Sequence, residues 1–527
     1  MGVYVNPGNK GFAKDIAAEI YVDKTELLEL INRRLGSRDV FFCNSRPRRF
    51  GKSMTINMLT AYYSKGCDSE ALFAPFEIAS KPSFLKHLNK YNLIRIDVQS
   101  AKGLAGNVNK LIDYLNKTIV AELQQEYSTI ALKENCSLQQ ALITLHQQLG
   151  IEFIILLDEW DCIIRDDCKN LQAQKEYIDF LRGLFKGVEA SEYICCAYMT
   201  GILPIKKYNT QSALNNFEEF TMLDAACFTK FVGFTESEVR SLCTSYGQDF
   251  AKVRLWYDGY LLGGQHIYNP QAVISLLSRK EFKSYWSQTG TYESILELLQ
   301  LDFAGLKQCV IKMLAGEEVP ADVRSFSNDM ISFKSLDDVL TALIHLGYLG
   351  YNSREGTVFI PNEEIRSELE LATKQQEWQE GRELMLASKE LLEATWSLNN
   401  IKVAEIIESF HQKYASILQY NNENALSSVI GLAYIAAMEY YYAPIREMPA
   451  GKGFADIVYY PKREKHQLPA LIIELKWNKN ATAALKQIKT KGYTEALQGY
   501  AGRALLIGIN YDKQSKEHTC LIEEVNL

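Results

Sequence analysis

The chain has 527 residues, which is too long for one ordinary hydrophobic core, so we expect several domains. Its 47% hydrophobic and 23% charged residues are the proportions of a folded globular protein. The formal net charge of −7 excludes a general electrostatic attraction to nucleic acid.

The cysteines and the apolar stretches of the sequence indicate the cellular compartment of the protein. The 11 cysteines are scattered without C-x-x-C pairs, which is typical of reduced thiols rather than of a disulfide or zinc framework. The N-terminus lacks the basic and apolar regions of a signal peptide. No apolar stretch reaches the roughly 18 residues of a membrane helix, and the nearest is interrupted by Glu439. We therefore expect a soluble, cytoplasmic protein with no membrane partner.

The first elements along the chain are a helix over 27–35, for which Thr25 is the expected N-cap, and a strand over 40–43. An amphipathic segment begins at Met54. Between the strand and this segment, residues 45–53 read SRPRRFGKS.

Residues 45–53 have the parts of a phosphate-binding loop. In such a loop, backbone N–H groups at the helix start face the phosphates, a lysine (here Lys52) reaches the β and γ groups, and a hydroxyl (here Ser53) binds Mg²⁺. Arg46, however, stands where the consensus G-x-x-x-x-G-K-[ST] has its first glycine. A basic turn before a helix is therefore the alternative interpretation.

A continuous apolar run over 153–157 ends in Asp158 and Glu159. The run predicts a central strand that is buried on both faces, with the two acids at its carboxyl end, where open α/β sheets bind ligands. Asp158 would hold Mg²⁺ through water, and Glu159 would orient or deprotonate an attacking water. The alternative is a buried strand with a solvated acidic end.

Strands and helices alternate around these two elements. We expect further strands at 94–98 and 193–199 and helices at 104–126, 137–149 and 172–187. This alternation predicts a mostly parallel sheet with helices on both faces. Thr200 would lie at the carboxyl end of a strand, where it either senses a γ-phosphate or caps the next segment.

From about residue 226 the pattern becomes helical and predicts a lid, with a helix start at Thr235. A helix over 335–346, followed by strands at 347–351 and 357–361, suggests a winged helix. Because the helix is acidic at its start, we favour a module that packs or regulates over one that binds DNA. Residues 363–415 are charged and helical, as in a connector.

The C-terminal part holds a second group of charged residues. Glu474 and Lys476 lie two apart in an apolar strand, so they project from the same face. If the preceding strand pairs with this one, Asp456 meets Glu474, and two carboxylates converge with an ammonium group. Hard oxygen ligands suit Mg²⁺ or Mn²⁺, which would activate water and polarise a phosphodiester while Lys476 offsets transition-state charge.

Three further residues extend this prediction. Glu423, at the start of an apolar helix, is a candidate third carboxylate. Gln487 and Tyr493, on the next helix, would flank the site as supporting residues. The alternative to a metal-dependent nuclease site is a structural hairpin held by salt bridges.

Taken together, the chain resembles bacterial proteins in which an AAA-ATPase-like domain precedes a C-terminal PD-(D/E)xK nuclease domain. The resemblance covers nearly the whole chain and rests on the strings YVDKT at 21–25, RPRRFGKS at 46–53, LDE at 157–159, TGILPI at 200–205, WYDGY at 256–260 and YNP at 268–270. Within that family Arg46 is typical. Two positions depart from the family pattern: Phe454 stands where relatives often have arginine, and the helix after Glu423 lacks a frequent histidine.

The resemblance implies site residues for both halves. It implies ATP binding by Lys52 and Ser53, Mg²⁺ coordination by Asp158, and water activation by Glu159. The predicted cofactor-binding set is Arg49, Gly51, Lys52, Ser53, Asp158 and Thr200. In the C-terminal domain the resemblance assigns Asp456, Glu474 and Lys476 to the D…ExK motif, with Glu423 and Gln487 as supporting residues. The predicted metal ligands are Asp456, Glu474 and Glu423 there, and Ser53 and Asp158 in the first half.

The predicted fold is α/β throughout: a P-loop NTPase with a parallel sheet, helical lid and winged helix, then a restriction-endonuclease-like domain. The expected boundaries are 1–225 for the ATPase domain, 226–332 for the lid, 333–380 for the winged-helix-like module, 381–415 for the connector and 416–527 for the nuclease-like domain. The leading hypothesis is an ATP-regulated, metal-dependent endonuclease acting on DNA through its C-terminal domain, with bacterial genome defence or mobile-element biology as the implied setting.

The alternative function is an oligomerising signalling ATPase switch, in which the nuclease-like domain only binds nucleic acid or a partner. A homo-oligomer is therefore among the expected partners. The cofactors are ATP and Mg²⁺, or Mn²⁺ at the nuclease-like site.

Overall fold

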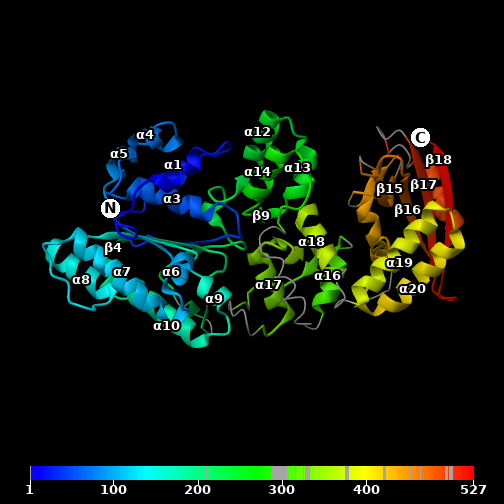
Figure 1. Ribbon diagram of the computed structural model, residues 1–527. Coiled ribbons are helices and arrows are strands. Elements are labelled where there is room, and N and C mark those ends of the chain that lie inside the picture. Colours follow the sequence, from blue (N-terminus) through cyan, green and yellow to red (C-terminus); the bar gives the residue numbers. More distant parts are fainter. Residues whose placement is uncertain are drawn as a thin grey trace. The chain divides into compact units, whose positions relative to one another are not determined.

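The structure is a computed structural model and divides into two compact units. Unit 1 comprises Met1–Thr289 and Pro320–Ile365, and unit 2 comprises Gly290–Val319 and Arg366–Leu527 (Figure 1). It describes the chain except for residues 1, 206, 209–210, 213, 287–304, 315, 325, 327–332, 374–378, 419–422, 443, 451–452, 463–464, 493–496, 498–501 and 527. Each unit is described by itself.

A five-stranded sheet in the order β2-β3-β4-β1-β7 forms the centre of unit 1. Its strands are β1 (Phe41–Ser45), β2 (Asn92–Asp97), β3 (Phe153–Asp158), β4 (Ile194–Gly201) and β7 (Glu218–Phe220). Every neighbouring pair is parallel. The expected parallel sheet is therefore confirmed, and the position of β3 inside the sheet, between β2 and β4, explains why its sequence is apolar without interruption.

Helices cover both faces of this sheet, as the alternation predicted (Figure 1). Along β3, Phe153, Ile155 and Leu157 belong to one core with α7 (Leu111–Glu126), α8 (Leu138–Leu149) and α10 (Leu171–Phe185). Ile154 and Leu156 belong to a second core with α2 (Glu26–Asn32) and α3 (Lys52–Tyr63). Successive side chains of a strand point to opposite faces, so one apolar run supplies two cores.

Shorter elements complete this part of unit 1. They are α1 (Lys10–Ile16), α4 (Glu70–Phe73), α5 (Phe84–His87), α6 (Val98–Ala105), α9 (Cys162–Asp166), α11 (Ala190–Tyr193), β5 (Lys207–Tyr208) and β6 (Gln211–Ser212). The expected helix over 104–126 is thus two helices, α6 and α7, because Gly106 adopts a left-handed backbone (φ 70°) and ends α6. Thr25 precedes α2, but its hydroxyl does not cap the helix and instead accepts a hydrogen bond from the Ile78 N–H.

The helical region after residue 226 contains α12 (Glu236–Tyr246), α13 (Phe250–Tyr257) and α14 (Pro270–Arg279), with a small sheet in the order β8-β10-β9. The strands of that sheet are β8 (Phe234–Thr235), β9 (Tyr260–Leu262) and β10 (Gln265–Tyr268). Thr235 and Glu238 form a capping box at the start of α12, as the sequence predicted.

The helix and hairpin expected over 335–361 are present as α17 (Leu336–Leu346), β12 (Gly350–Asn352) and β13 (Thr357–Phe359), and the two strands pair antiparallel. Other elements near them in the sequence are α16 (Leu306–Leu314), β11 (Val319–Pro320) and α18 (Glu363–Thr373).

Unit 2 is built on a mixed sheet in the order β14-β15-β16-β17-β18. The strands are β14 (Ile445–Ala450), β15 (Gly453–Tyr459), β16 (Ala470–Trp477), β17 (Arg503–Asp512) and β18 (Glu517–Asn526). β16 and β17 are parallel, and the other pairs are antiparallel. The strand pairing on which the C-terminal prediction depends is therefore present.

The sheet of unit 2 has helices against it. Ile472 of β16 and Leu506 of β17 share a core with Leu485 and Ile488 of α22 (Ala481–Lys491). α20 (Asn400–Leu418) packs against β18, and α21 (Glu423–Ala433) packs against β16. α19 (Gln379–Trp396) packs on α20. Helices α19 and α20 lie where the sequence suggested a connector, and they are packed parts of this unit.

Within the described residues, no helix combines the length and the apolar character that crossing a bilayer requires.

Candidate functional site

The predicted phosphate-binding loop joins β1 to α3. Gly51 is the N-cap of α3 and has φ 95°, and Arg49 in the same loop has φ 67°. A Cβ at Gly51 would meet nothing within 4 Å, so the left-handed backbone, rather than crowding, favours glycine there. The N–H groups of the first helical turn have no partner within the helix, which makes this end of α3 suited to an anion.

Lys52 lies at the start of α3 and is almost completely buried. Its Nζ donates a hydrogen bond to the Pro47 carbonyl oxygen at 3.0 Å and lies 4.0 Å from Glu159 Oε1. The ammonium group therefore lies between the loop and the end of β3. Burial lowers the pKa of Lys52, and the nearby carboxylates of Glu159, Asp161 and Asp158 oppose that shift.

Arg46, which replaces the first glycine of the loop consensus, is fully buried. Its backbone N–H donates to the Gly201 carbonyl at 3.0 Å, and its Nη1 donates to the carbonyls of Ser45 at 2.9 Å and Phe220 at 3.1 Å. Burial lowers the pKa of Arg46 to about 10. Arg46 thus links the carboxyl ends of β1, β4 and β7, and this location accounts for an arginine where other loops have glycine.

Asp158 and Glu159 lie at the carboxyl end of β3, as predicted. Asp158 is 2% exposed; burial raises its pKa to about 6, and a hydrogen bond from the Ser53 side chain opposes the shift. The Ser53 hydroxyl and the Asp158 carboxylate therefore lie together. A hydroxyl beside a buried carboxylate supplies oxygen donors that suit Mg²⁺.

Glu159 belongs to a charged network that the sequence did not reveal. Its Oε2 accepts from Arg165 Nη2 at 3.1 Å, and Arg165 Nη1 donates to Asp161 Oδ2 at the same distance. Asp161 is fully buried and also accepts from the N–H groups of Ile202 and Leu203. The network holds the Glu159 carboxylate in position. The four-residue spacing of Asp161 and Arg165 could have predicted their ion pair. The hydrogen bonds from Ile202 and Leu203 to Asp161 could not be predicted, because those residues are distant in the sequence.

Thr200 is fully buried on β4, next to β1. Its hydroxyl donates to the Asn44 carbonyl oxygen at 2.9 Å, and its own carbonyl accepts from the Trp160 N–H. In this conformation the Thr200 hydroxyl joins two strands.

A mostly apolar pocket of about 70 Å³ lies beside Gly51. Four separate segments line it: residues 20–24, the end of the loop with the start of α3, residues 231–234, and the start of α14. The lining residues are Ile20, Tyr21, Val22, Lys24, Phe50, Gly51, Met54, Thr55, Met58, Phe231, Gly233, Phe234, Pro270 and Ile274. Apart from Gly51, these residues were not predicted as site residues, although Tyr21, Val22 and Lys24 belong to the YVDKT string and Pro270 to the YNP string.

The C-terminal group of charged residues converges as expected. Asp456 lies on β15, and Glu474 and Lys476 lie on the adjacent β16. Asp456 Oδ2 accepts from the Leu475 N–H at 2.7 Å, and Lys476 Nζ donates to Glu474 Oε1 at the same distance. The three side chains therefore lie on one part of the sheet.

Electrostatics distinguish this group from an ordinary salt-bridged hairpin. Glu474 is 1% exposed; burial and then the negative charge of Asp456 raise its pKa to about 7, while Lys476 lowers it. Glu474 Oε2 is buried without a hydrogen-bond partner among the described residues. A buried carboxylate oxygen without a partner, next to a second carboxylate, fits a divalent cation.

The structure describes the predicted supporting residues only in part. Gln487 lies half-buried on α22. Glu423 is the first residue of α21, but its side chain is not described, and Tyr493 lies outside the described residues. Phe454, two residues before Asp456 on β15, is 61% exposed.

The chain has a weak similarity to two solved structures. The ORC2 protein of Aeropyrum pernix in ADPNP–ADP complexes shows 9% identity and a TM-score of 0.28 over 69% of this chain and 97% of that one. Cdc6p from Pyrobaculum aerophilum shows 9% identity and a TM-score of 0.24 over 71% of this chain and 98% of that one.

A curated relative, described as "Uncharacterized protein in vnfD 5'region" of Azotobacter chroococcum mcd 1, is 27% identical over 288 residues. The match covers 53% of this chain and 52% of the relative, so the chain spans about half the length of the curated relative that it matches.

Two family models match separate parts of the chain. Residues 11–210 match the model described as Predicted AAA-ATPase, and this range contains the loop, β3 and β4. Residues 421–519 match the PD-(D/E)XK nuclease superfamily, and this range contains Asp456, Glu474 and Lys476. The chain thus combines an AAA-ATPase-like domain with a C-terminal domain of the PD-(D/E)XK nuclease superfamily.

Proposed function

We propose that the protein is an ATP-regulated, metal-dependent nuclease that cleaves DNA phosphodiester bonds in its C-terminal domain. The observation that carries this proposal is the convergence of Asp456, Glu474 and Lys476, with Glu474 Oε2 buried and without a partner among the described residues. Two carboxylates that share a buried setting are electrostatically unfavourable unless a proton or a cation joins them.

Each side chain of the group has a role in this proposal. Asp456 and Glu474 hold Mg²⁺ or Mn²⁺, which when bound activates water and polarises the scissile phosphodiester. Lys476 keeps its ammonium beside Glu474 and offsets negative charge as the transition state forms. Phe454, exposed on the same strand as Asp456, is available to contact the substrate. Glu423, Gln487 and Tyr493 remain proposed supporting residues.

The proposed nucleotide site uses the loop and the end of β3. Arg49, Gly51, Lys52 and Ser53 would contact the phosphates, Ser53 and Asp158 would hold Mg²⁺, and Glu159 would orient the attacking water. Thr200 would sense the γ-phosphate if its hydroxyl leaves the Asn44 carbonyl. The apolar pocket beside Gly51 would take the purine ring, because its lining is mostly hydrophobic and adjoins the helix start.

We propose that the domains meet at residues 225, 332, 380 and 415, as expected from the sequence. The module over 333–380 would be a winged helix that packs or regulates, and the assembled protein would be a homo-oligomer. Genome defence or mobile-element biology is the setting that we propose.

The test is a cleavage assay on supercoiled plasmid and single-stranded DNA, with Mg²⁺ or Mn²⁺, with and without ATP. The full chain should cleave only with a divalent ion, and Asp456→Asn and Lys476→Ala should each lose at least about 100-fold in rate. Glu523→Gln, an exposed acid on β18 whose partner is Lys489, is the control and should cleave normally.

Cleavage that is unchanged in both Asp456→Asn and Lys476→Ala would refute the nuclease proposal. Absence of cleavage under every metal, together with ATP-dependent assembly in light scattering, would instead support the oligomerising ATPase switch.

A further inference from the structure

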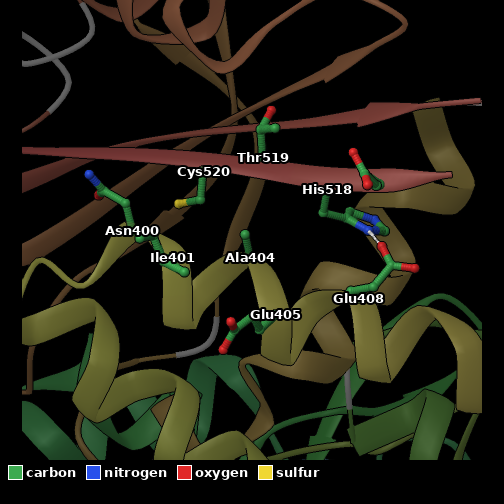
Figure 2. A pocket seen from close by; sticks show the side chains of 9 residues that line it. Asn400, Ile401, Ala404, Glu405, Glu408, His518, Thr519 and Cys520 are labelled. Carbon is green, nitrogen blue, oxygen red and sulfur yellow. Dashed lines mark hydrogen bonds and ion pairs between the residues drawn. The ribbon is translucent and has the colours of Figure 1, made fainter. Parts of the chain in front are cut away.

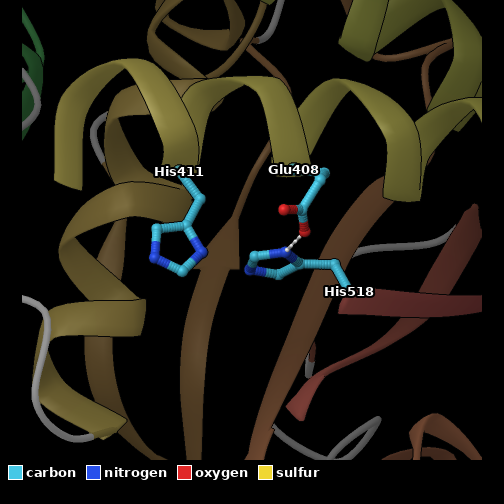
Figure 3. Close-up of side chains that lie close together, drawn as sticks. All are labelled: Glu408, His411 and His518. Carbon is cyan, nitrogen blue, oxygen red and sulfur yellow. Dashed lines mark hydrogen bonds and ion pairs between the residues drawn. The ribbon is translucent and has the colours of Figure 1, made fainter. Parts of the chain in front are cut away.

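Three side chains of unit 2 form a cluster that the nuclease proposal does not use. Glu408 and His411 lie three residues apart on α20 and so share one face of that helix, and His518 lies on β18. One possible ligand atom from each side chain lies within 4.8 Å of the other two. Figure 3 shows the two imidazole rings side by side below the helix, with the Glu408 carboxylate directed at His518.

The cluster is held in place by its surroundings. The His518 side chain is completely buried, and its Nδ1 lies 2.5 Å from Glu408 Oε2. The His411 and His518 ring centroids are 5.1 Å apart, and the Tyr511 ring lies 4.7 Å from the first and 4.8 Å from the second. Burial lowers the pKa of both histidines, and the Glu408 carboxylate opposes that shift.

A groove of about 390 Å³ opens beside the cluster, between α20 and β18 (Figure 2). Glu405, Glu408 and Glu517 contribute carboxylates to its lining. Its described lining contains no lysine or arginine, so the groove has a negative charge. It gives a cation and water a route to the cluster.

The cluster lies on the opposite face of the sheet from the nuclease group. Trp477 pairs with Tyr511 across β16 and β17, and Tyr511 pairs with His518 across β17 and β18. Paired residues project from the same face, and Trp477 follows Lys476, so Lys476 projects from the other face. The two groups of side chains are therefore separate sites.

We propose that Glu408, His411 and His518 bind one divalent transition-metal ion of the zinc class. Two imidazoles and one carboxylate are a donor set typical of zinc with a fourth position open to water, whereas Mg²⁺ and Ca²⁺ prefer oxygen donors. The ion replaces the Glu408–His518 hydrogen bond, and the neutral imidazole that binds it through one ring nitrogen carries its proton on the other. The groove supplies the water for the open position. Because the ligands come from α20 and β18, the ion also fastens this helix to the edge strand, to which the Ile522 N–H and Asn400 Oδ1 already join it.

The experiment uses the full chain, freed of metal and titrated with ZnCl₂ by calorimetry, and separately with Co²⁺, whose visible spectrum reports imidazole ligation. The wild type should bind one zinc at this site, and binding should persist in Asp456→Asn. Glu408→Gln and His411→Gln should each weaken zinc binding by roughly 100-fold or more and lose the imidazole-type Co²⁺ spectrum.

Glu405→Gln is the matched control, because Glu405 lines the same groove one turn earlier on α20 but is not in the cluster. It should retain zinc affinity within about threefold, since it changes only the surrounding charge. Circular dichroism confirms that each variant is folded. The proposal is overturned if Glu408→Gln and His411→Gln bind zinc as the wild type does, or if Asp456→Asn alone abolishes binding.

Discussion

Among single residues, Glu474 is a buried carboxylate that lies beside a second carboxylate. It is buried beside Asp456, and its pKa is raised to about 7 even though Lys476 donates to it. Without metal, the folded protein therefore keeps a proton on Glu474 at a pH at which the unfolded chain has released it. Because the folded state then binds more protons, its stability falls as the pH rises from about 4.5 towards 7.

This gives a test at the residue scale. In metal-free protein, the stability of the wild type relative to Glu474→Gln should fall between pH 5 and pH 8 by at most roughly 3 kcal/mol, which corresponds to the pKa shift. Added Mg²⁺ should restore the wild type at pH 8, because it favours the ionised carboxylate, and should leave Glu474→Gln unchanged. Urea unfolding at several pH values measures both effects. A difference between the two proteins that is constant with pH would contradict the buried, protonated Glu474.

Among elements, α12 is joined to the N-terminal segment that lines the apolar pocket. Lys24 Nζ donates to both carboxylate oxygens of Glu238, at 2.6 and 2.7 Å, and to the Lys230 carbonyl at 2.8 Å. Glu238 also completes the capping box with Thr235. One carboxylate thus fixes the start of a helix and the position of a pocket-lining lysine.

We expect Glu238→Gln to weaken binding of a non-hydrolysable ATP analogue by roughly 10-fold, because a mostly buried charged hydrogen bond is worth about 1.5–3 kcal/mol. Glu236→Gln is the matched control on the same helix. Its partner Arg240 is 57% exposed, so its loss should change affinity little. Equal affinities for the two variants in calorimetry would show that the Lys24–Glu238 contact does not shape the nucleotide site.

At the scale of the whole molecule, the proposal requires that nucleotide binding in unit 1 alters cleavage in unit 2. Lys52→Ala removes the ammonium from the loop and leaves Asp456, Glu474 and Lys476 unchanged. It should abolish any change of the cleavage rate with ATP and leave the metal-dependent rate without ATP within about twofold, because it alters none of the proposed cleaving groups. Cleavage rates measured across an ATP titration test this. If cleavage by the Lys52→Ala protein still changes with ATP, the loop does not mediate the regulation by ATP.

Local motifs made much of this molecule predictable from its sequence. The string ending in Lys52 and Ser53, the apolar run before Asp158 and the Glu474–Lys476 spacing each depend on neighbours in the chain and on the period of a strand. The convergence of Asp456 with Glu474 needed only one strand pairing.

Other features depend on contacts between distant segments. Arg46 bonds to the Phe220 carbonyl, Asp161 accepts from residues 202 and 203, and Glu408 meets His518 across 110 positions. No local pattern records such partners. Thr25 is a further example: the local sequence predicted that its hydroxyl caps α2, but the hydroxyl accepts a hydrogen bond from the distant Ile78 N–H.

The junction of Lys476 and Trp477 has a practical consequence for protein engineering. These neighbours share one peptide bond but belong to opposite faces, and the indole ring lies 4.9 Å from the ring of Tyr511. A substitution at Trp477 or Tyr511 that shifts the backbone of β16 will therefore also move the Lys476 amine on the opposite face. Substitutions there should preserve ring volume, so that a change in turnover can be traced to chemistry and not to a displaced strand.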